Sequence, residues 1–167
     1  MCYSGFWGAP WLPARLRRIR KMLDLAGLAP GQVLLDLGSG DGRILVMAAL
    51  SYGARCQGVE IDPVRFAFSR LLVRLFKLTD RIEIAWGDMY NFNLSRADVI
   101  VLHLSRGAND GLRQALAGEV GRGATIVSLT FPIEGWSETL YDPQERVYVY
   151  RTTSRADLDP VNAEALA

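Results

Sequence analysis

The chain has 167 residues, of which 50% are apolar and 22% are charged, a composition typical of one globular domain. Nineteen lysines and arginines against eighteen acidic residues leave a formal charge of +1, which argues against a dedicated nucleic-acid binder. Two cysteines and one histidine exclude a disulfide framework and a histidine-rich metal site.

The first predicted element is a helix from Pro13 to Ala26. Apolar residues recur there at helical spacing, Pro13 suits the first turn, and Gly27 suits the end. The opposite face is basic and carries Arg15, Arg17, Arg18, Arg20 and Lys21. We interpret this face either as solvated surface or as a contact for acidic lipid headgroups or an acidic partner.

Short apolar runs then alternate with helical patterns. Strands are predicted at 33–37, 56–61, 82–86, 98–104 and 124–131, and helices at 43–52, 63–78 and 109–116. Asp62 is the expected N-cap of the longest helix, with Pro63 in its first position. Segments 139–141 and 146–151 predict a hairpin around 142–145. The alternation predicts an α/β fold with a Rossmann-like, doubly wound, mostly parallel seven-stranded sheet and a C-terminal antiparallel hairpin.

Acidic residues follow three consecutive predicted strands, at the edge where such sheets bind ligands. The candidate binding residues are Asp36, Gly38, Ser39, Gly40, Asp41, Glu60, Ile61, Asp88 and Met89. Gly38 and Gly40 allow the backbone to come close to a ligand. The dinucleotide fingerprint G-x-G-x-x-G would need a glycine where Arg43 stands, and the carboxylates would repel a pyrophosphate.

The acidic set suits a ligand with a cationic head, such as the α-ammonium and sulfonium of S-adenosylmethionine. Glu60, 22 residues after Gly38, can accept hydrogen bonds from a ribose diol. Asp88 can accept from an adenine amino group, and Met89 can pack on the adenine ring. The pattern therefore predicts an S-adenosylmethionine site without a metal.

The segment LDLGSGDGR at 35–43, followed by GVEID, resembles the class I S-adenosylmethionine-dependent methyltransferases. A narrower resemblance combines it with GAPWLP at 8–13, ADVIVLHL at 97–104, and SLTFP at 128–132 with Trp136. This set is similar to the small archaeal and bacterial protein-lysine methyltransferases, which are related to the lysine methyltransferase of the mitochondrial ATP synthase c subunit.

The resemblance implies that residues 1–14, with Trp11 and Pro13, close over the cofactor. It also implies that the segment after the fifth strand borders an acceptor channel. The catalytic candidates are His103, Phe131, Pro132 and Trp136. Two alternatives stay open: a backbone-bonded strand-end histidine for His103, and ordinary packing for the aromatic residues. Residues 15–152 are the expected methyltransferase domain, and 153–167 an expected mobile tail.

The predicted activity is methyl transfer to a lysine amine of a protein substrate by in-line displacement. One alternative is a small-molecule or nucleic-acid acceptor on the same fold, and another is a non-catalytic cofactor-binding domain. Nucleic acid is not the expected partner, because Leu104-Ser105-Arg106-Gly107 stands where base-methylating enzymes carry Asn/Asp-Pro-Pro-aromatic. The expected location is cytoplasmic, with membrane association if an anchor precedes residue 1, as in some family members.

Overall fold

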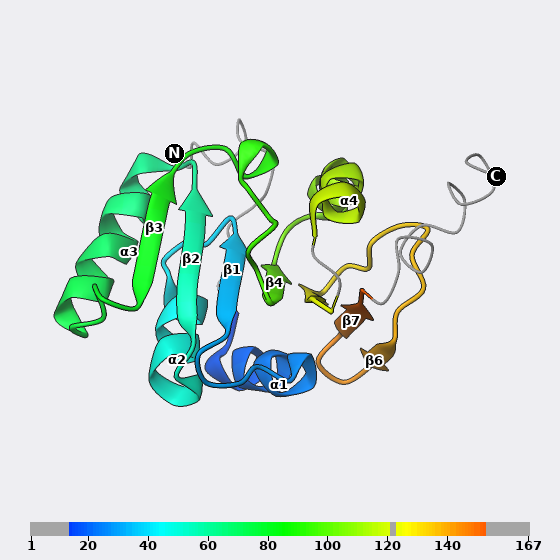
Figure 1. Cartoon of the computed structure of the whole chain (residues 1–167), viewed down its shortest axis with the longest axis horizontal. Coiled ribbons are helices and arrows are strands. Elements are labelled where there is room, and N and C mark those ends of the chain that lie inside the picture. Colours follow the sequence, from blue (N-terminus) through cyan, green and yellow to red (C-terminus); the bar gives the residue numbers. More distant parts are fainter. Residues whose placement is uncertain (1–13, 121–122, 153–167) are drawn as a thin grey trace.

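The computed structural model describes residues 14–120 and 123–152. The described part contains one sheet of seven strands in the order β3-β2-β1-β4-β5-β7-β6 (Figure 1). The strands are β1 (Val33–Leu37), β2 (Arg55–Glu60), β3 (Ile82–Trp86), β4 (Val99–Leu102), β5 (Thr125–Leu129), β6 (Leu140–Asp142) and β7 (Val147–Arg151). The helices are α1 (Leu16–Ala26), α2 (Arg43–Tyr52), α3 (Pro63–Leu75), α4 (Arg106–Glu119) and the short 3-10 turn η2 (Met89–Asn91).

The five strands β1 to β5 are parallel, and the closing hairpin is antiparallel. The strand order changes direction between β1 and β4, which is the switch point where ligands bind in such sheets. The fold therefore confirms the doubly wound, mostly parallel seven-stranded sheet with a C-terminal hairpin. It also brings the carboxyl ends of β1, β2, β3 and β4 to one edge.

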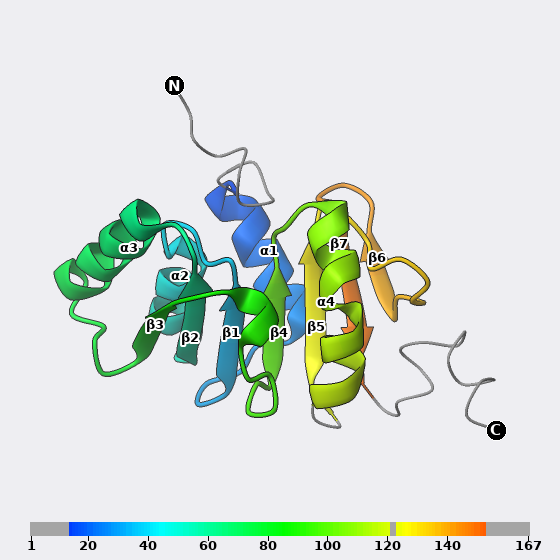
Figure 2. The ribbon, with the colours of Figure 1, turned by 90° about the horizontal axis from the view of Figure 1, so that it is seen from above.

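Figure 2 shows from above that helices cover both faces of the sheet, and an apolar core lies on each face. One core lies under α1 and α2, where Ile19, Leu23 and Leu45 pack against alternate strand residues such as Val101. The other lies under α4, whose Leu112 and Leu116 pack against the opposite strand face. The alternation follows from the period of two in a strand, which turns successive side chains to opposite faces.

Predicted and observed elements differ mainly at their ends. Helix α4 begins three residues earlier than predicted, because the Ser105 side chain accepts from the Ala108 N–H at 3.3 Å and caps the helix. Helix α3 ends at Leu75 instead of Leu78, since Lys77 takes a left-handed backbone with φ of 55°. The turn η2 was not predicted; the Asp88 carboxylate caps it by accepting from the Tyr90 N–H at 3.0 Å.

None of the helices in the described ranges has both the length and the apolar composition needed to cross a bilayer.

Candidate active site

The glycine loop follows β1 and turns sharply across the end of β2. Gly38, Gly40 and Gly42 all have positive φ, at 76°, 57° and 79°. The N–H groups of Gly38 and Ser39 both donate to the Val59 carbonyl, at 3.0 and 2.9 Å. A Cβ on Gly38 would lie 2.8 Å from the Leu104 Cδ2, and the positive φ would strain any larger residue there.

Asp36 is the most unusual residue of the site. Its side chain is buried on β1, and neither carboxylate oxygen has a hydrogen-bond partner in the described part of the chain. Burial, and then the nearby carboxylates of Glu60 and Asp41, raise the pKa of Asp36 to about 8. A buried carboxyl without a donor needs a cation or a proton, so this position suits a cationic ligand.

Glu60 links the glycine loop to the start of α3. One of its oxygens accepts from the Gly40 N–H at 2.8 Å, and the other accepts from the Asp62 N–H at 2.9 Å. Asp62 in turn caps α3 by accepting from the N–H groups of Val64 and Arg65. Each carboxylate oxygen has a second lone pair, so Glu60 is fixed in position with acceptors left for a diol.

Asp41 is neutralised by a near neighbour. The Arg43 Nε donates to both of its oxygens, at 2.9 and 2.8 Å, and Arg43 also donates to the Ala14 carbonyl at 3.1 Å. The Asp41–Arg43 pair therefore ties the glycine loop to the chain entering α1. Asp41 was predicted as a cofactor-binding residue; in the structure its charge is already balanced by Arg43.

The predicted residues on the adenine side lie around the end of β3. Asp88 is exposed and keeps one oxygen beyond the bond that caps η2. Met89 is half-buried, with its sulfur about 4.0 Å from the position that a Gly38 Cβ would take. Ile61 is half-buried, and its carbonyl accepts from the Trp86 indole N–H at 3.0 Å. Ser39 is buried beside them, and its hydroxyl has no partner in the described residues.

His103 lies one residue beyond β4, on the face covered by α1 and α2. Burial, followed by the charges of Arg18 and Arg43, lowers the pKa of His103 below its usual 6.5. The imidazole is therefore neutral at pH 7. The same surroundings would lower the pKa of a primary ammonium placed next to it, because they disfavour any positive charge.

The segment after β5 is held in an unusual backbone conformation. Thr130 has a φ of 82°, which is rare for a β-branched residue. Its N–H donates to the Arg146 carbonyl at 2.8 Å, and the Arg146 guanidinium donates to the Thr130 carbonyl at 2.9 Å. Arg146 also lies over the Phe131 ring, 5.9 Å from its centroid. The β6–β7 turn thus fixes the segment that carries Phe131.

A buried asparagine holds the same segment from the other side of the sheet. Asn109, in α4, donates to the Ser128 hydroxyl at 3.0 Å and to the Phe131 carbonyl at 3.1 Å. Ser128 itself donates to the Phe131 carbonyl at 2.6 Å. Sequence reasoning missed Asn109. An asparagine in an otherwise apolar helical face was the available signal.

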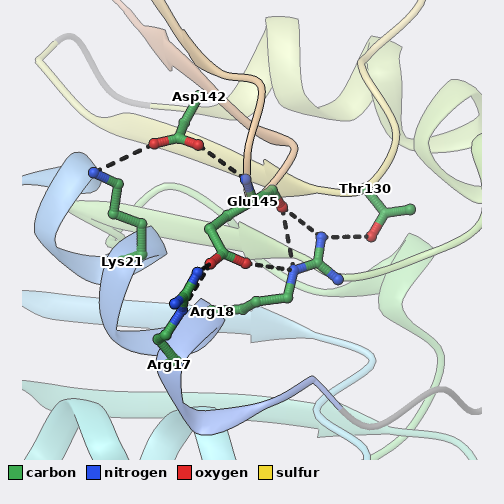
Figure 3. Close-up of polar contacts among 6 residues, drawn as sticks. All are labelled: Arg17, Arg18, Lys21, Thr130, Asp142 and Glu145. Atoms are coloured by element: carbon green, nitrogen blue, oxygen red, sulfur yellow. Dashed lines mark hydrogen bonds and ion pairs between the residues drawn. The ribbon is translucent and has the colours of Figure 1, made fainter.

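Basic side chains of α1 bind residues of the β6–β7 turn, as Figure 3 shows. Arg18 donates to the Glu145 carbonyl and to the Thr130 hydroxyl, the latter at 3.3 Å. Arg17 pairs with the Glu145 carboxylate, and Lys21 lies 3.3 Å from that of Asp142. Arg17, Arg18 and Lys21 are therefore paired with acidic residues of the same chain, which corrects the interpretation as a contact for an external acid for these three. Arg17 and Lys21 remain exposed, as the interpretation as solvated surface expected.

Trp136 packs in the core under α4. It is buried, and its ring meets that of Tyr150 edge-on with centroids 5.8 Å apart. This position gives Trp136 a packing role, and a role at the acceptor channel stays a prediction. Phe131 and Pro132 are half-buried. Trp11 and Pro13 lie outside the described residues, as does the predicted tail.

The described residues contain no cluster of three or more histidine, cysteine or acidic side chains that could hold a metal ion.

Comparisons with known proteins agree with this geometry. A family model described as the ANTKMT methyltransferase domain matches residues 36–140. A protein-lysine N-methyltransferase of Saccharolobus islandicus is 31% identical over 129 residues, covering 77% of this chain and 80% of that protein. An adenine nucleotide translocase lysine N-methyltransferase of Mus musculus is 29% identical over 84% of this chain, which spans 62% of the mouse protein.

A solved structure shares most of the fold. It is an RNA methyltransferase from Salinibacter ruber in complex with S-adenosyl-L-homocysteine, with a TM-score of 0.82 and 34% identity. The match covers 84% of this chain and 94% of that one.

Proposed function

The chain belongs to the ANTKMT methyltransferase domain family, and from this premise we propose that it transfers the methyl group of S-adenosylmethionine to a lysine amine of a protein. The carboxylate of Asp36 suits the cationic part of the cofactor. Glu60 has acceptors left for its ribose, and we assign Met89, whose sulfur lies near Gly38, to packing on the adenine ring.

The main support for lysine as the methyl acceptor comes from the segment after β4. His103 and Leu104 lead directly into Ser105, which caps α4, so the backbone there is committed to starting a helix. A base-binding Asn/Asp-Pro-Pro-aromatic segment would occupy this position in an amino-methylating enzyme of nucleic acids. In its place stands a neutral, partly buried imidazole near two arginines.

These surroundings favour the reactive form of lysine. At pH 7 deprotonating an ordinary lysine, with a pKa of about 10.4, requires about 4.6 kcal/mol. Burial and the charges of Arg18 and Arg43, which already lower the pKa of His103, act on a lysine ammonium in the same direction. The neutral amine then attacks the methyl carbon, the carbon–sulfur bond breaks, S-adenosylhomocysteine leaves, and a proton passes to water.

RNA is the second candidate acceptor, because the Salinibacter ruber structure that is 34% identical to this chain carries an RNA methyltransferase title. The cytoplasmic location stays a prediction. Membrane association through an anchor preceding residue 1 also stays a prediction.

The test is transfer of a labelled methyl group from S-adenosylmethionine into a cell extract that includes membranes. Protein, RNA and small molecules are separated afterwards, and the protein is hydrolysed. The expected result is label in methyl-lysine with the wild type and none with Glu60→Ala. Label in RNA or in metabolites would overturn the lysine acceptor and leave the methyltransferase assignment intact.

A further inference from the structure

The outer face of α3 carries an exposed apolar stripe. Val64, Phe68, Leu71 and Leu75 are 75%, 49%, 52% and 68% exposed. At about 100° per residue these four positions fall within a strip of about 60°. The buried residues of the helix, Ser69 and Val73, lie on the opposite side, against the sheet. A surface helix normally presents polar residues there, so this stripe lacks a partner within the described chain.

Two further aromatic residues near the ends of α3 are exposed. Phe76 is 50% exposed just after α3. Trp86, at the end of β3, is 66% exposed, and its position is fixed by its hydrogen bond to Ile61 and by stacking on Phe66. In both views α3 forms the outer margin of the molecule beyond β3, with no other helix or strand on its outer side (Figures 1 and 2).

The same segment is strongly basic. From Pro63 to Thr79 the chain has four cationic residues and no carboxylate. Among the described residues, no carboxylate pairs with Arg70, Arg74 or Lys77, unlike Arg17, Arg18 and Lys21 of α1. Their charge is therefore available to an external anion.

A basic cleft lies beside the arginines of α3. It has a volume of about 670 Å³ and reaches the amino ends of β1, β2 and β3. Its charged lining consists of Arg55, Arg70, Arg74, Arg81, Arg96, Asp80 and Glu83. Five arginines against two carboxylates leave an excess of three positive charges, which suits phosphate groups.

We propose that α3 rests on an anionic lipid surface. The stripe would enter the boundary between headgroups and acyl chains, while Arg70, Arg74 and the cleft hold lipid phosphates. Trp86 has the amphipathic ring and the position expected at such an interface. Because α3 begins directly after Glu60 and Asp62, the methyl-transfer site would lie at one end of the surface that meets the membrane.

A second copy of the chain and a nucleic acid are two other possible partners for the outer face of α3, and both match its side chains less well. A symmetric dimer through α3 would place Arg70 and Arg74 against the same residues of a second copy, and like charges would oppose the contact. Nucleic acid would use the arginines, but valine and leucine offer no stacking surface for bases. An anionic lipid layer satisfies both the cations and the aliphatic side chains.

The experiment is co-sedimentation of the full chain with vesicles. One set contains phosphatidylcholine alone, and the other contains about 30% phosphatidylglycerol as the anionic lipid. Leu71→Ser combined with Leu75→Ser removes the centre of the stripe. Leu16→Ser combined with Leu50→Ser is the matched control, because these two leucines are 61% and 55% exposed on α1 and α2.

We expect the wild type and the control to bind the anionic vesicles, and the stripe variant to bind at least about tenfold more weakly. Added salt should weaken wild-type binding, since part of the attraction is electrostatic. Equal binding by the stripe variant would refute the proposal, as would no binding by the wild type. Dimers or RNA complexes of the wild type that disappear in the stripe variant would assign α3 to those partners and refute it too. Unchanged melting temperatures establish that the variants fold.

Discussion

Replacing Asp36 with asparagine should change how stability depends on pH. The folded protein holds the Asp36 proton up to a pKa of about 8, whereas the unfolded chain releases it near 3.8. The folded state therefore binds more protons between these values, and the free energy of unfolding falls as the pH rises through the interval. The loss begins above about pH 4 and is complete above about pH 8.

The size of the effect follows from the pKa difference. About four units at about 1.4 kcal/mol each give about 6 kcal/mol as the upper limit. Water reaching the ionised carboxylate would reduce this, so we expect at least about 2 kcal/mol between pH 5 and pH 9. Asparagine keeps the shape of the side chain and stays neutral throughout. The stability of Asp36→Asn relative to the wild type should therefore rise by that amount with pH.

The assay is urea unfolding of both proteins without cofactor, at pH 5, 7 and 9. The His103 pKa is lowered in the folded state, so the contribution of His103 to the free energy of unfolding is lost as the pH falls below about 6.5. Both proteins share this contribution, so it cancels when their stabilities are compared. A stability difference that does not change with pH would refute the reasoning, because it would mean that Asp36 ionises normally when buried.

Three further predictions concern the site. Glu60→Gln should weaken S-adenosylmethionine binding by about 1–3 kcal/mol in calorimetry, since an amide cannot accept from both the Gly40 and Asp62 N–H groups; unchanged affinity would contradict the ribose assignment. His103→Ala should lower turnover less than about tenfold, and a loss above about a thousandfold would identify the imidazole as an essential proton acceptor. Arg18→Gln should lower kcat several-fold and leave the cofactor Kd unchanged, because the substitution removes the hydrogen bond from Arg18 to the Thr130 hydroxyl. The matched variant is Arg17→Gln, because Arg17 contacts Glu145 alone, and it should leave kcat unchanged. Equal losses of kcat in the two variants would mean that the role of Arg18 is purely structural.

The fold could be predicted where local signals were strong. The strands at 33–37 and 82–86 and the helix at 43–52 have the predicted bounds, because short apolar runs ended at glycines or turns. Helix α4 was predicted three residues short at each end, since its cap depends on one serine following a strand. The resemblance to class I methyltransferases is confirmed by the family match over residues 36–140.

The site could be predicted only in part. Asp36 and Glu60 were found because topology alone brings the carboxyl ends of parallel strands together. The bonds that fix the segment after β5 come from residues far away in sequence: Arg18 and Glu145 are 127 positions apart, and Asn109 and Phe131 are 22 apart. No pattern in one sequence encodes such pairs. The burial of Trp136 could not be predicted either: its ring packs against that of Tyr150, 14 positions away, while its role at the acceptor channel stays a prediction.

A comparison of helices α1 and α3 shows that the charge pattern of a helix does not by itself predict where an external anion binds. Helix α1 has the more conspicuous basic face, yet Arg17, Arg18 and Lys21 bind the β6–β7 turn and so hold Thr130 and Phe131 in place. Helix α3 has fewer cations, but Arg70 and Arg74 have no carboxylate partner among the described residues and flank exposed leucines. A cation paired within the fold is less available to bind an external anion, because its N–H donors already hold a carboxylate or a carbonyl. We therefore expect acidic lipid headgroups, which the sequence analysis considered for α1, to bind at α3.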